Sequence, residues 1–216
     1  YSSNCTFQVQ WEMREIPKFY NDLDLTLKEI KYLLSRGVKD RKSNFHYTVL
    51  STIKNNTPES RTVILRSFNE EIFELNVHSD LRSDKIDQIE KNNKVSCLFY
   101  DDKKKIQIRN NGTTKLEKSY EPSWNKLTNW SKRCYLSTEK PGTEVLEPTQ
   151  GFPDEFINNS PDDDNSIKGL KNFTIIKIII SKIEWLFLAS QGHRRAKFEI
   201  DREGSLTKII RKWLVP

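Results

Sequence analysis

Cysteine and histidine are scarce in this sequence, and their spacing excludes the frameworks that usually depend on them. The chain has three cysteines, none of which forms a C-x-x-C pair with another: Cys5, Cys97 and Cys134. It also has only three histidines, His46, His78 and His193. A disulfide framework needs paired cysteines, and a structural zinc site needs four clustered ligands. We therefore expect neither a disulfide framework nor a metal site.

Long apolar runs are also missing. No stretch is long enough to cross a bilayer, and the first residues lack the basic start and apolar centre of a secretory signal. Internal repeats are absent, as are Ser-His-Asp and H-E-x-x-H patterns. We expect a cytoplasmic protein.

The chain carries a net positive charge that is not concentrated in any one segment. Lys and Arg number 36 against 30 acidic residues, which gives a net charge of +6 and a pI of about 9.1. The cations are spread along the chain rather than gathered in blocks, so we do not expect nucleic acid as a partner. An excess of positive charge equally suits a protein that attracts small phosphorylated ligands.

The length and composition are those of one folded domain. The chain has 216 residues, of which 11% are aromatic, and a mean hydropathy of -0.73. This is too aromatic for a disordered chain and long enough to bury a proper core. We expect a single domain over residues 1–216.

One amphipathic helix precedes a series of strands. Over residues 21–37 apolar side chains recur at helical spacing, Asn21 or Asp22 can cap the start, and Gly37 ends the pattern. We expect this helix to pack across an open end of a barrel. A second, short helix is predicted over Arg82–Lys91, capped by Ser79 or Asp80.

Alternating apolar residues predict short strands joined mostly by tight turns. The expected strands are Phe45–Ile53, a partner that ends near Phe68, Ile72–Val77, Lys94–Tyr100, Lys105–Arg109, Phe173–Ile180, Ile183–Ala189 and Ala196–Ile200. The alternation of strands and helices typical of a doubly wound fold is missing. The pattern favours a mainly β fold with a few helices, an antiparallel barrel.

Between the fifth and sixth strands the pattern weakens. Residues Pro122–Lys132 look helical, with an apolar stripe of Trp124, Leu127 and Trp130. Residues 141–169 carry most of the prolines and an acidic run, with little periodicity, and are expected to form a mobile loop.

The segment Pro58–Arg66 places Arg61 and Arg66 at the ends of an otherwise β-branched and aliphatic stretch. Burying long charged side chains beside a core is costly unless an anion meets them, and a guanidinium matches phosphate oxygens in a two-pronged contact. A phosphorylated ligand explains this strand, although arginines paired with Glu59 or Glu70 on a surface strand would look the same.

Two later segments follow at the spacing of successive elements in one small β domain, Leu81–Lys85 and Lys105–Arg109. With Pro58–Arg66 they resemble the FMN-binding split barrels typified by pyridoxine/pyridoxamine 5'-phosphate oxidase, whose pattern runs R-x-V-L-L-K, S-x-K and Q-V-R. The resemblance extends from about residue 40 to the C-terminus, interrupted by the loop. It implies an antiparallel FMN-binding split β-barrel.

The resemblance implies a set of FMN-binding residues. Arg61 would bind the phosphate with Ser83 and Lys85, which lie at a helix start whose free N–H groups favour an anion. Asp84 replaces a family arginine, for which Arg82 would compensate. The full set of cofactor residues is Arg61, Thr62, Val63, Ile64, Leu65, Arg66, His78, Ser79, Ser83, Lys85, Gln107, Trp185 and Arg195.

The expected substrate side departs more from the family. The implied substrate residues are Arg66, Tyr135, Lys140 and His193, and no catalytic residue is assigned. Arg66 stands where the family has lysine, while Lys140 and Gln191 stand where it has arginines. Lysine does not replace arginine in a bidentate phosphate clamp, so the substrate pocket is altered.

Three functions remain open. The first is an FMN-dependent oxidoreductase that transfers a hydride from a small substrate, phosphorylated or not, to the flavin, which itself carries the chemistry. The second is a genuine pyridoxamine 5'-phosphate oxidase. The third is a non-enzymatic protein that binds flavin or nucleic acid.

The resemblance also implies a homodimer with FMN in clefts shared by the two chains. An exposed barrel flank would account for so many aromatics in a polar sequence. In that dimer Arg61 and Lys85 would come from one chain, with Gln107 and Arg195 from the other.

Overall fold

A closed antiparallel barrel forms the centre of the molecule. The structure is a computed structural model that describes residues 15–203 and 206–216, so Cys5 lies outside the described residues. The barrel strands are β1 (Tyr47–Lys54), β2 (Thr57–Asn69), β3 (Glu74–Asp80), β4 (Lys94–Asp101), β5 (Ile106–Lys118) and β6 (Phe173–Phe187). They follow the order β3-β2-β1-β4-β5-β6, and pairing of β3 with β6 closes the barrel. The mainly β fold expected from the sequence is confirmed.

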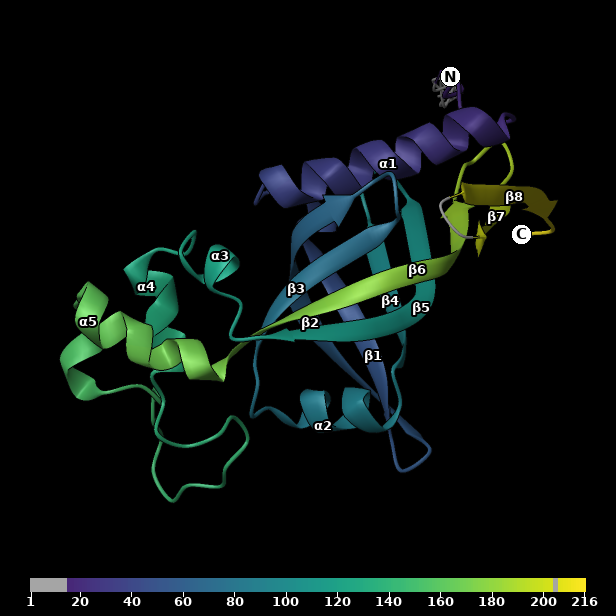
Figure 1. The fold of residues 1–216 in the computed structure, drawn as a ribbon. Helices are drawn as coiled ribbons and strands as arrows, with labels where there is room; N and C mark the ends of the chain where they lie inside the picture. Colours follow the sequence, from purple (N-terminus) through teal and green to yellow (C-terminus); the bar gives the residue numbers. More distant parts are fainter. Residues whose placement is uncertain (1–14, 204–205) are drawn as a thin grey trace, which may run out of the picture.

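The barrel splits along β6. Residues Phe173–Ile179 of this long strand pair with β3, whereas Lys182–Phe187 pair with β7 (Arg194–Glu203). Strand β7 in turn pairs with β8 (Leu206–Leu214). Figure 1 shows these last two strands turned away from the barrel at its upper end. The sequence pattern wrongly divided β6 into two strands, and β8 was not predicted.

Helix α1 (Leu23–Lys39) lies across the upper end of the barrel (Figure 1). Its apolar stripe is buried in the barrel core, with Ile30, Leu33 and Leu34 almost fully inaccessible. The side chain of Asp22 accepts a hydrogen bond from the Leu25 backbone amide at 2.8 Å, as the capping prediction requires. The expected helix and its position are therefore confirmed.

Gly37 does not end this helix, contrary to the sequence prediction. The helix continues to Lys39, and Gly37 is buried against the backbone of Phe45, where any Cβ atom would collide with the Phe45 carbonyl. The glycine therefore permits a close approach of chain segments rather than a change of backbone direction.

Helix α2 (Asp84–Lys91) covers the opposite end of the barrel. Ile86 and Ile89 face the core, as predicted. The N-cap is Ser83 rather than Ser79 or Asp80, because Asp80 still belongs to β3.

A lobe between β5 and β6 lies beside the barrel (Figure 1). The predicted helix over Pro122–Lys132 is wrong: two four-residue turns form instead, and Trp130 is 48% exposed. The expected loop also contains short helical turns. The elements of this lobe are α3 (Glu121–Trp124), α4 (Asn129–Lys132), α5 (Asp163–Ser166) and the 3-10 turns Arg133–Tyr135, Asp154–Phe156 and Ile167–Asn172.

The lobe has its own small apolar centre. Trp124 is fully buried, and its ring lies 5.4 Å from that of Phe173 and 5.5 Å from that of Tyr135. Gly169 fits against the Trp124 and Tyr135 side chains. This packing fixes Tyr135 beside the start of β6.

Two absences apply to the described residues. None of their helices is both long and apolar enough to span a membrane. Residues 15–203 and 206–216 also contain no group of three or more histidine, cysteine or acidic side chains that could hold a metal ion.

Candidate functional site

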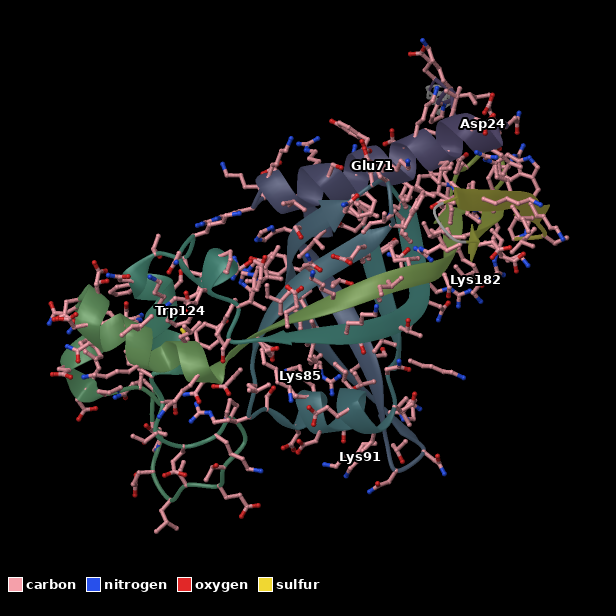
Figure 2. The ribbon with its side chains drawn as sticks, viewed as in Figure 1. Asp24, Glu71, Lys85, Lys91, Trp124 and Lys182 are labelled. Carbon is pink, nitrogen blue, oxygen red and sulfur yellow. The ribbon has the colours of Figure 1, made fainter. Side chains whose placement is uncertain are left out.

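Arg61, Ser79, Ser83 and Lys85 come together at the beginning of α2, and we call them the α2 cation cluster. The Lys85 ammonium donates to the Ser79 hydroxyl at 3.2 Å and to the Ser83 hydroxyl at 3.1 Å. Figure 2 shows Lys85 between α2 and the barrel strands above it. Three separate elements, β2, β3 and α2, therefore deliver the residues of one cluster.

Strand register explains why Arg61 reaches this cluster. Arg61 lies opposite Leu50 in the β1–β2 hairpin, so its side chain shares the inner face of the barrel with that buried leucine. The guanidinium donates to the hydroxyl of Thr52 and, at 3.1 Å, to the side-chain oxygen of Gln88 on α2. It is thereby held at the open end of the barrel covered by α2.

The cluster holds two cations close to each other. Burial lowers the pKa of Arg61, and Glu59 at 3.5 Å opposes this only in part. Burial and then the positive charge of Arg61 lower the pKa of Lys85, whereas Asp80 and Asp84 act in the opposite direction. Both cations are thus poorly solvated and close to each other, which favours an anion between them.

Arg82 does not take the place of the family arginine replaced by Asp84. It donates to both carboxylate oxygens of Asp80, at 3.0 and 2.7 Å, and to the backbone oxygen of Ser137 at 2.8 Å. Arg82 therefore ties the lobe to the end of β3. The expectation that Arg82 compensates for the arginine replaced by Asp84 is therefore wrong.

Arg66 belongs to a second group, formed with His78 and Tyr135, which we call the Arg66 group. Arg66 lies five residues beyond Arg61 on β2, at an irregularity in the β2–β3 register between Leu65 and Ser67. Its side chain is exposed, and no carboxylate of a described residue lies within ion-pair distance. Arg66 is therefore not part of the α2 cation cluster.

His78 and Tyr135 both sense the charge of Arg66. Burial and then Arg66 lower the pKa of His78 to about 4, so its imidazole is neutral at physiological pH. Its Nδ1 atom is buried without a hydrogen-bond partner among the described residues. Burial raises the pKa of Tyr135, which keeps its phenol protonated, although Arg66 acts in the opposite direction. The group therefore combines one cation with two neutral polar rings.

Gln107, Leu186 and Arg195 lie side by side on the outer face of β5, β6 and β7, and we call them the outer row. Gln107 is the register partner of Leu186, which is the partner of Arg195. The flanking Ile106, Ile108 and Ala196 are buried on the inner face, so these three side chains point outward. The outer row thus joins two of the predicted cofactor residues.

Trp185 is not part of this row. Its side chain is 1% exposed and packs edge-on against Phe19 inside the barrel core, with ring centroids 5.4 Å apart. Because alternate residues of a strand face opposite sides, Leu186 rather than Trp185 points outward at this part of β6. The assignment of Trp185 as a side chain facing a cofactor is contradicted.

A cleft of about 490 Å³ adjoins the outer row. It is lined by His193, Arg195 and residues of the C-terminal strand, including Trp213 and Leu214. The predicted substrate histidine therefore shares a concave surface with Arg195, and this surface adjoins the Lys182–Phe187 part of β6, whereas His78 of the Arg66 group pairs with Ile175 near the start of β6.

Lys140 lies in the lobe near the first turn of α2. Its ammonium is 3.9 Å from a carboxylate oxygen of Asp84, which directly precedes Lys85. It also borders an open pocket of about 550 Å³ lined by residues between Ser137 and Gly151. Lys140 is thus adjacent to the α2 cation cluster rather than to His193.

The remaining predicted cofactor residues are the four between Arg61 and Arg66 on β2. The side chains of Thr62 and Ile64 point outward, whereas Val63 and Leu65 face the core, with Leu65 fully buried. The sequence analysis missed Gln88 and Leu186, which complete the α2 cation cluster and the outer row. Gln88 could have been found because it lies three residues after Lys85 on the same helix face.

The comparisons with known proteins agree with the split-barrel fold. Residues 28–118 match the family model described as pyridoxamine 5'-phosphate oxidase, FMN-binding domain. The matched stretch contains the α2 cation cluster and Gln107. No curated protein matches the chain.

Solved structures resemble nearly the whole chain. A pyridoxamine 5'-phosphate oxidase-related, FMN-binding protein from Nostoc punctiforme is 20% identical, with a TM-score of 0.69 over 94% of this chain and 100% of its own. PhzG from Burkholderia lata, solved with tetrahydrophenazine-1-carboxylic acid, is 16% identical, with a TM-score of 0.67 over 94% of this chain and 98% of its own. At these identities the likeness shows the fold.

The closed barrel, its splitting along β6 and its two covering helices define a split β-barrel protein. The expected resemblance is confirmed: residues 28–118 match the model of the pyridoxamine 5'-phosphate oxidase FMN-binding domain, and the chain shares the fold of FMN-binding split-barrel proteins.

Proposed function

We propose that this protein is an FMN-dependent flavoprotein oxidoreductase whose α2 cation cluster binds the FMN phosphate. The observation that carries the proposal is that Lys85, which donates to two serine hydroxyls, lies near Arg61, so that two partly buried cations with lowered pKa values share one end of the barrel. A phosphate would neutralise both cations and accept hydrogen bonds from all four side chains. Because FMN has a phosphate and riboflavin does not, the cluster favours FMN.

The local backbone supports the same ligand. Ser83 is the N-cap of α2, and its hydroxyl makes no capping hydrogen bond to the helix, so free N–H groups of the first turn remain. The positive end of the helix dipole adds to the attraction for an anion. The residues present therefore fit a phosphate group.

Flavin, when bound, would accept a hydride from the substrate, and the chain would hold and orient both molecules. Thr62–Leu65 on β2 lead from the α2 cation cluster to the Arg66 group, which is the direction in which a cofactor tail would continue towards its ring. The neutral His78 and Tyr135 and the exposed Arg66 then provide hydrogen bonds and one positive charge for a substrate. Such a group suits a small anionic substrate.

We propose that the complete site needs two chains. Within one chain Arg61 faces the inside of the barrel near α2, whereas Gln107 and Arg195 face outward on β5 and β7. The outer face also exposes aromatic rings, with Tyr47 49% and Tyr100 42% accessible. A homodimer would cover these rings and bring the outer row of one chain to the α2 cation cluster of the other.

The first experiment is the visible absorbance spectrum of the purified protein, before and after addition of FMN and removal of excess ligand. The proposal predicts a flavin spectrum in a stoichiometry of one FMN per chain. A protein that stays colourless after reconstitution, while circular dichroism shows it folded, would refute the proposal.

The reaction is tested separately once FMN is bound. Substitutions at the positions of Arg66, Lys140 and Gln191 support a substrate other than pyridoxamine 5'-phosphate. We therefore expect negligible formation of pyridoxal 5'-phosphate and peroxide at saturating FMN. Rapid turnover of pyridoxamine 5'-phosphate would identify a genuine vitamin B6 oxidase instead, and reduction of FMN by no tested donor would favour a flavin-binding protein without enzymatic activity.

A further inference from the structure

Glu184 on β6 is the centre of an ion-pair network on the outer face of the sheet. One of its carboxylate oxygens accepts from Arg195 at 2.8 Å and from Arg109, and the other accepts from Lys182 at 3.2 Å. The Glu184 side chain is 13% exposed, whereas Arg195 is 35% exposed. The carboxylate is therefore the fixed part of the network, and Arg195 is held by it.

The register of the strands places this network directly beside the outer row. Arg109 is the partner of Glu184, and Gln107 and Leu186 form the next pair that faces outward. Arg195 is paired with Leu186, so its guanidinium reaches Glu184 diagonally across the sheet. The same arginine also borders the 490 Å³ cleft.

Charge explains why the carboxylate is needed. Arg109, Lys182 and Arg195 surround one acidic group, and their like charges would otherwise repel one another. Burial alone would raise the pKa of Glu184, but hydrogen bonds from Arg195, Arg109 and Lys182 lower it to about 2. The carboxylate is thus ionised at any physiological pH and holds the two guanidinium groups at one oxygen.

We propose that Glu184 is a positioning residue that fixes the Arg195 guanidinium beside Gln107 for contact with the ring portion of the flavin. This inference rests on the proposed function and extends it, because it assigns a role to a residue that does not itself contact the ligand. Removal of Glu184 would free Arg195 to move away from Arg109 and would disorder the outer row.

The test compares FMN with riboflavin, which has the same ring but no phosphate. Glu184→Gln keeps the size of the side chain and removes its charge. We expect the Kd values for FMN and for riboflavin to rise by a similar factor of about ten, which corresponds to about 1.4 kcal/mol. A loss of phosphate binding would instead weaken FMN alone.

Glu199→Gln is the matched control, because Glu199 is an acidic residue on the same outer face that pairs with Lys197 at 2.9 Å. It makes the same change in net charge without touching Arg195. The control should leave both Kd values within twofold of wild type. An equal effect of the two substitutions would overturn the inference, since a general electrostatic change would then suffice.

A double-mutant cycle tests whether Glu184 acts through Arg195. In an Arg195→Ala background, Glu184→Gln should have no further effect on either Kd. An unchanged tenfold effect in that background would refute a positioning role. Wild-type protein that binds neither flavin would refute the proposed function itself, whereas flavin binding that is insensitive to Glu184→Gln would refute only this inference. Melting temperatures of all variants show whether each is folded.

Discussion

The Lys85 ammonium lies close enough to the Arg61 guanidinium for its pKa to be lowered by that charge as well as by burial. Folding thus holds two like charges near each other at the start of α2. Such an arrangement costs stability unless a ligand neutralises it, and strained or poorly compensated groups are concentrated at functional sites. Binding of phosphate at this point would relieve the repulsion.

Replacing Lys85 tests the α2 cation cluster. Lys85→Ala should raise the Kd for FMN by about ten- to a hundredfold, because a hydrogen bond to a charged group contributes about 1.5 to 3 kcal/mol. The Kd for riboflavin should change little. Lys91→Ala removes an exposed lysine from the other end of the same helix (Figure 2) and should have no effect on either. The prediction fails if both lysine variants bind FMN equally well.

His78 predicts a pH dependence of stability. Its pKa is about 4 in the folded protein and 6.5 in the unfolded chain, so the unfolded state binds the extra proton first as the pH falls. This contribution to stability is present above pH 6.5 and is lost between pH 6.5 and 4, with an upper limit of about 3 kcal/mol.

The measurement is urea unfolding of wild type and His78→Phe between pH 7.5 and 4. The substitution keeps a ring against Phe173, 4.9 Å away, and removes the titrating group. Wild type should lose more stability than the variant over this range. A constant difference at every pH would contradict the lowered pKa.

Substitution of Trp185 should lower the stability of the fold rather than the affinity for flavin. Trp185→Ala removes a fully buried ring from the barrel core and should destabilise the protein by about 3 to 5 kcal/mol. Trp185→Phe should cost less and leave the FMN Kd within twofold. If Trp185→Phe abolished FMN binding in a folded protein, the inward orientation of this side chain would be wrong.

Gly37 gives a steric prediction. In an exposed helix Gly→Ala would stabilise by about 1 kcal/mol, but here the added Cβ would collide with the backbone of Phe45. Gly37→Ala should therefore destabilise the protein, by about 1 to 3 kcal/mol, because overpacking exceeds the gain in helix propensity. Ser35→Ala in the same helix is the control and should be neutral or slightly stabilising in chemical denaturation.

The local elements could be predicted from sequence because local signals specify them. The β1–β2 hairpin turn contains Asn55 and Asn56, both with positive φ, which asparagine tolerates well. The cap at Asp22 and the inward Ile86 and Ile89 likewise follow from nearest neighbours. Arg61 and Lys85 were found because their motif spacing matches successive elements of one family.

Features that depend on pairing between distant strands could not be predicted from the sequence. The sequence pattern predicted separate strands that end at Ile180 and begin at Ile183, yet β6 is continuous because β5 pairs with it along nearly its entire length. The face of Trp185 was misjudged because a shift of one residue reverses the side to which every side chain points. Glu184 was missed because its three cationic partners come from β5, β6 and β7, and only the register brings them together.

Shared sites in a dimer predict complementation. A variant with Arg61→Ala and Lys85→Ala, and a second with Gln107→Ala and Arg195→Ala, should each bind FMN poorly. Their mixed dimer contains one site with neither defect and should recover up to half of the wild-type binding capacity. Scattering that shows only monomers at micromolar concentration, or mixtures that recover no binding, would contradict a site built from two chains.

The most direct test of the account is the calorimetric affinity of the wild-type protein for FMN beside its affinity for riboflavin. If Arg61 and Lys85 receive the phosphate, FMN should bind at least about a hundredfold more tightly, since two charged contacts contribute about 3 kcal/mol or more. Equal affinities for the two flavins would contradict the assignment of the α2 cation cluster as a phosphate site.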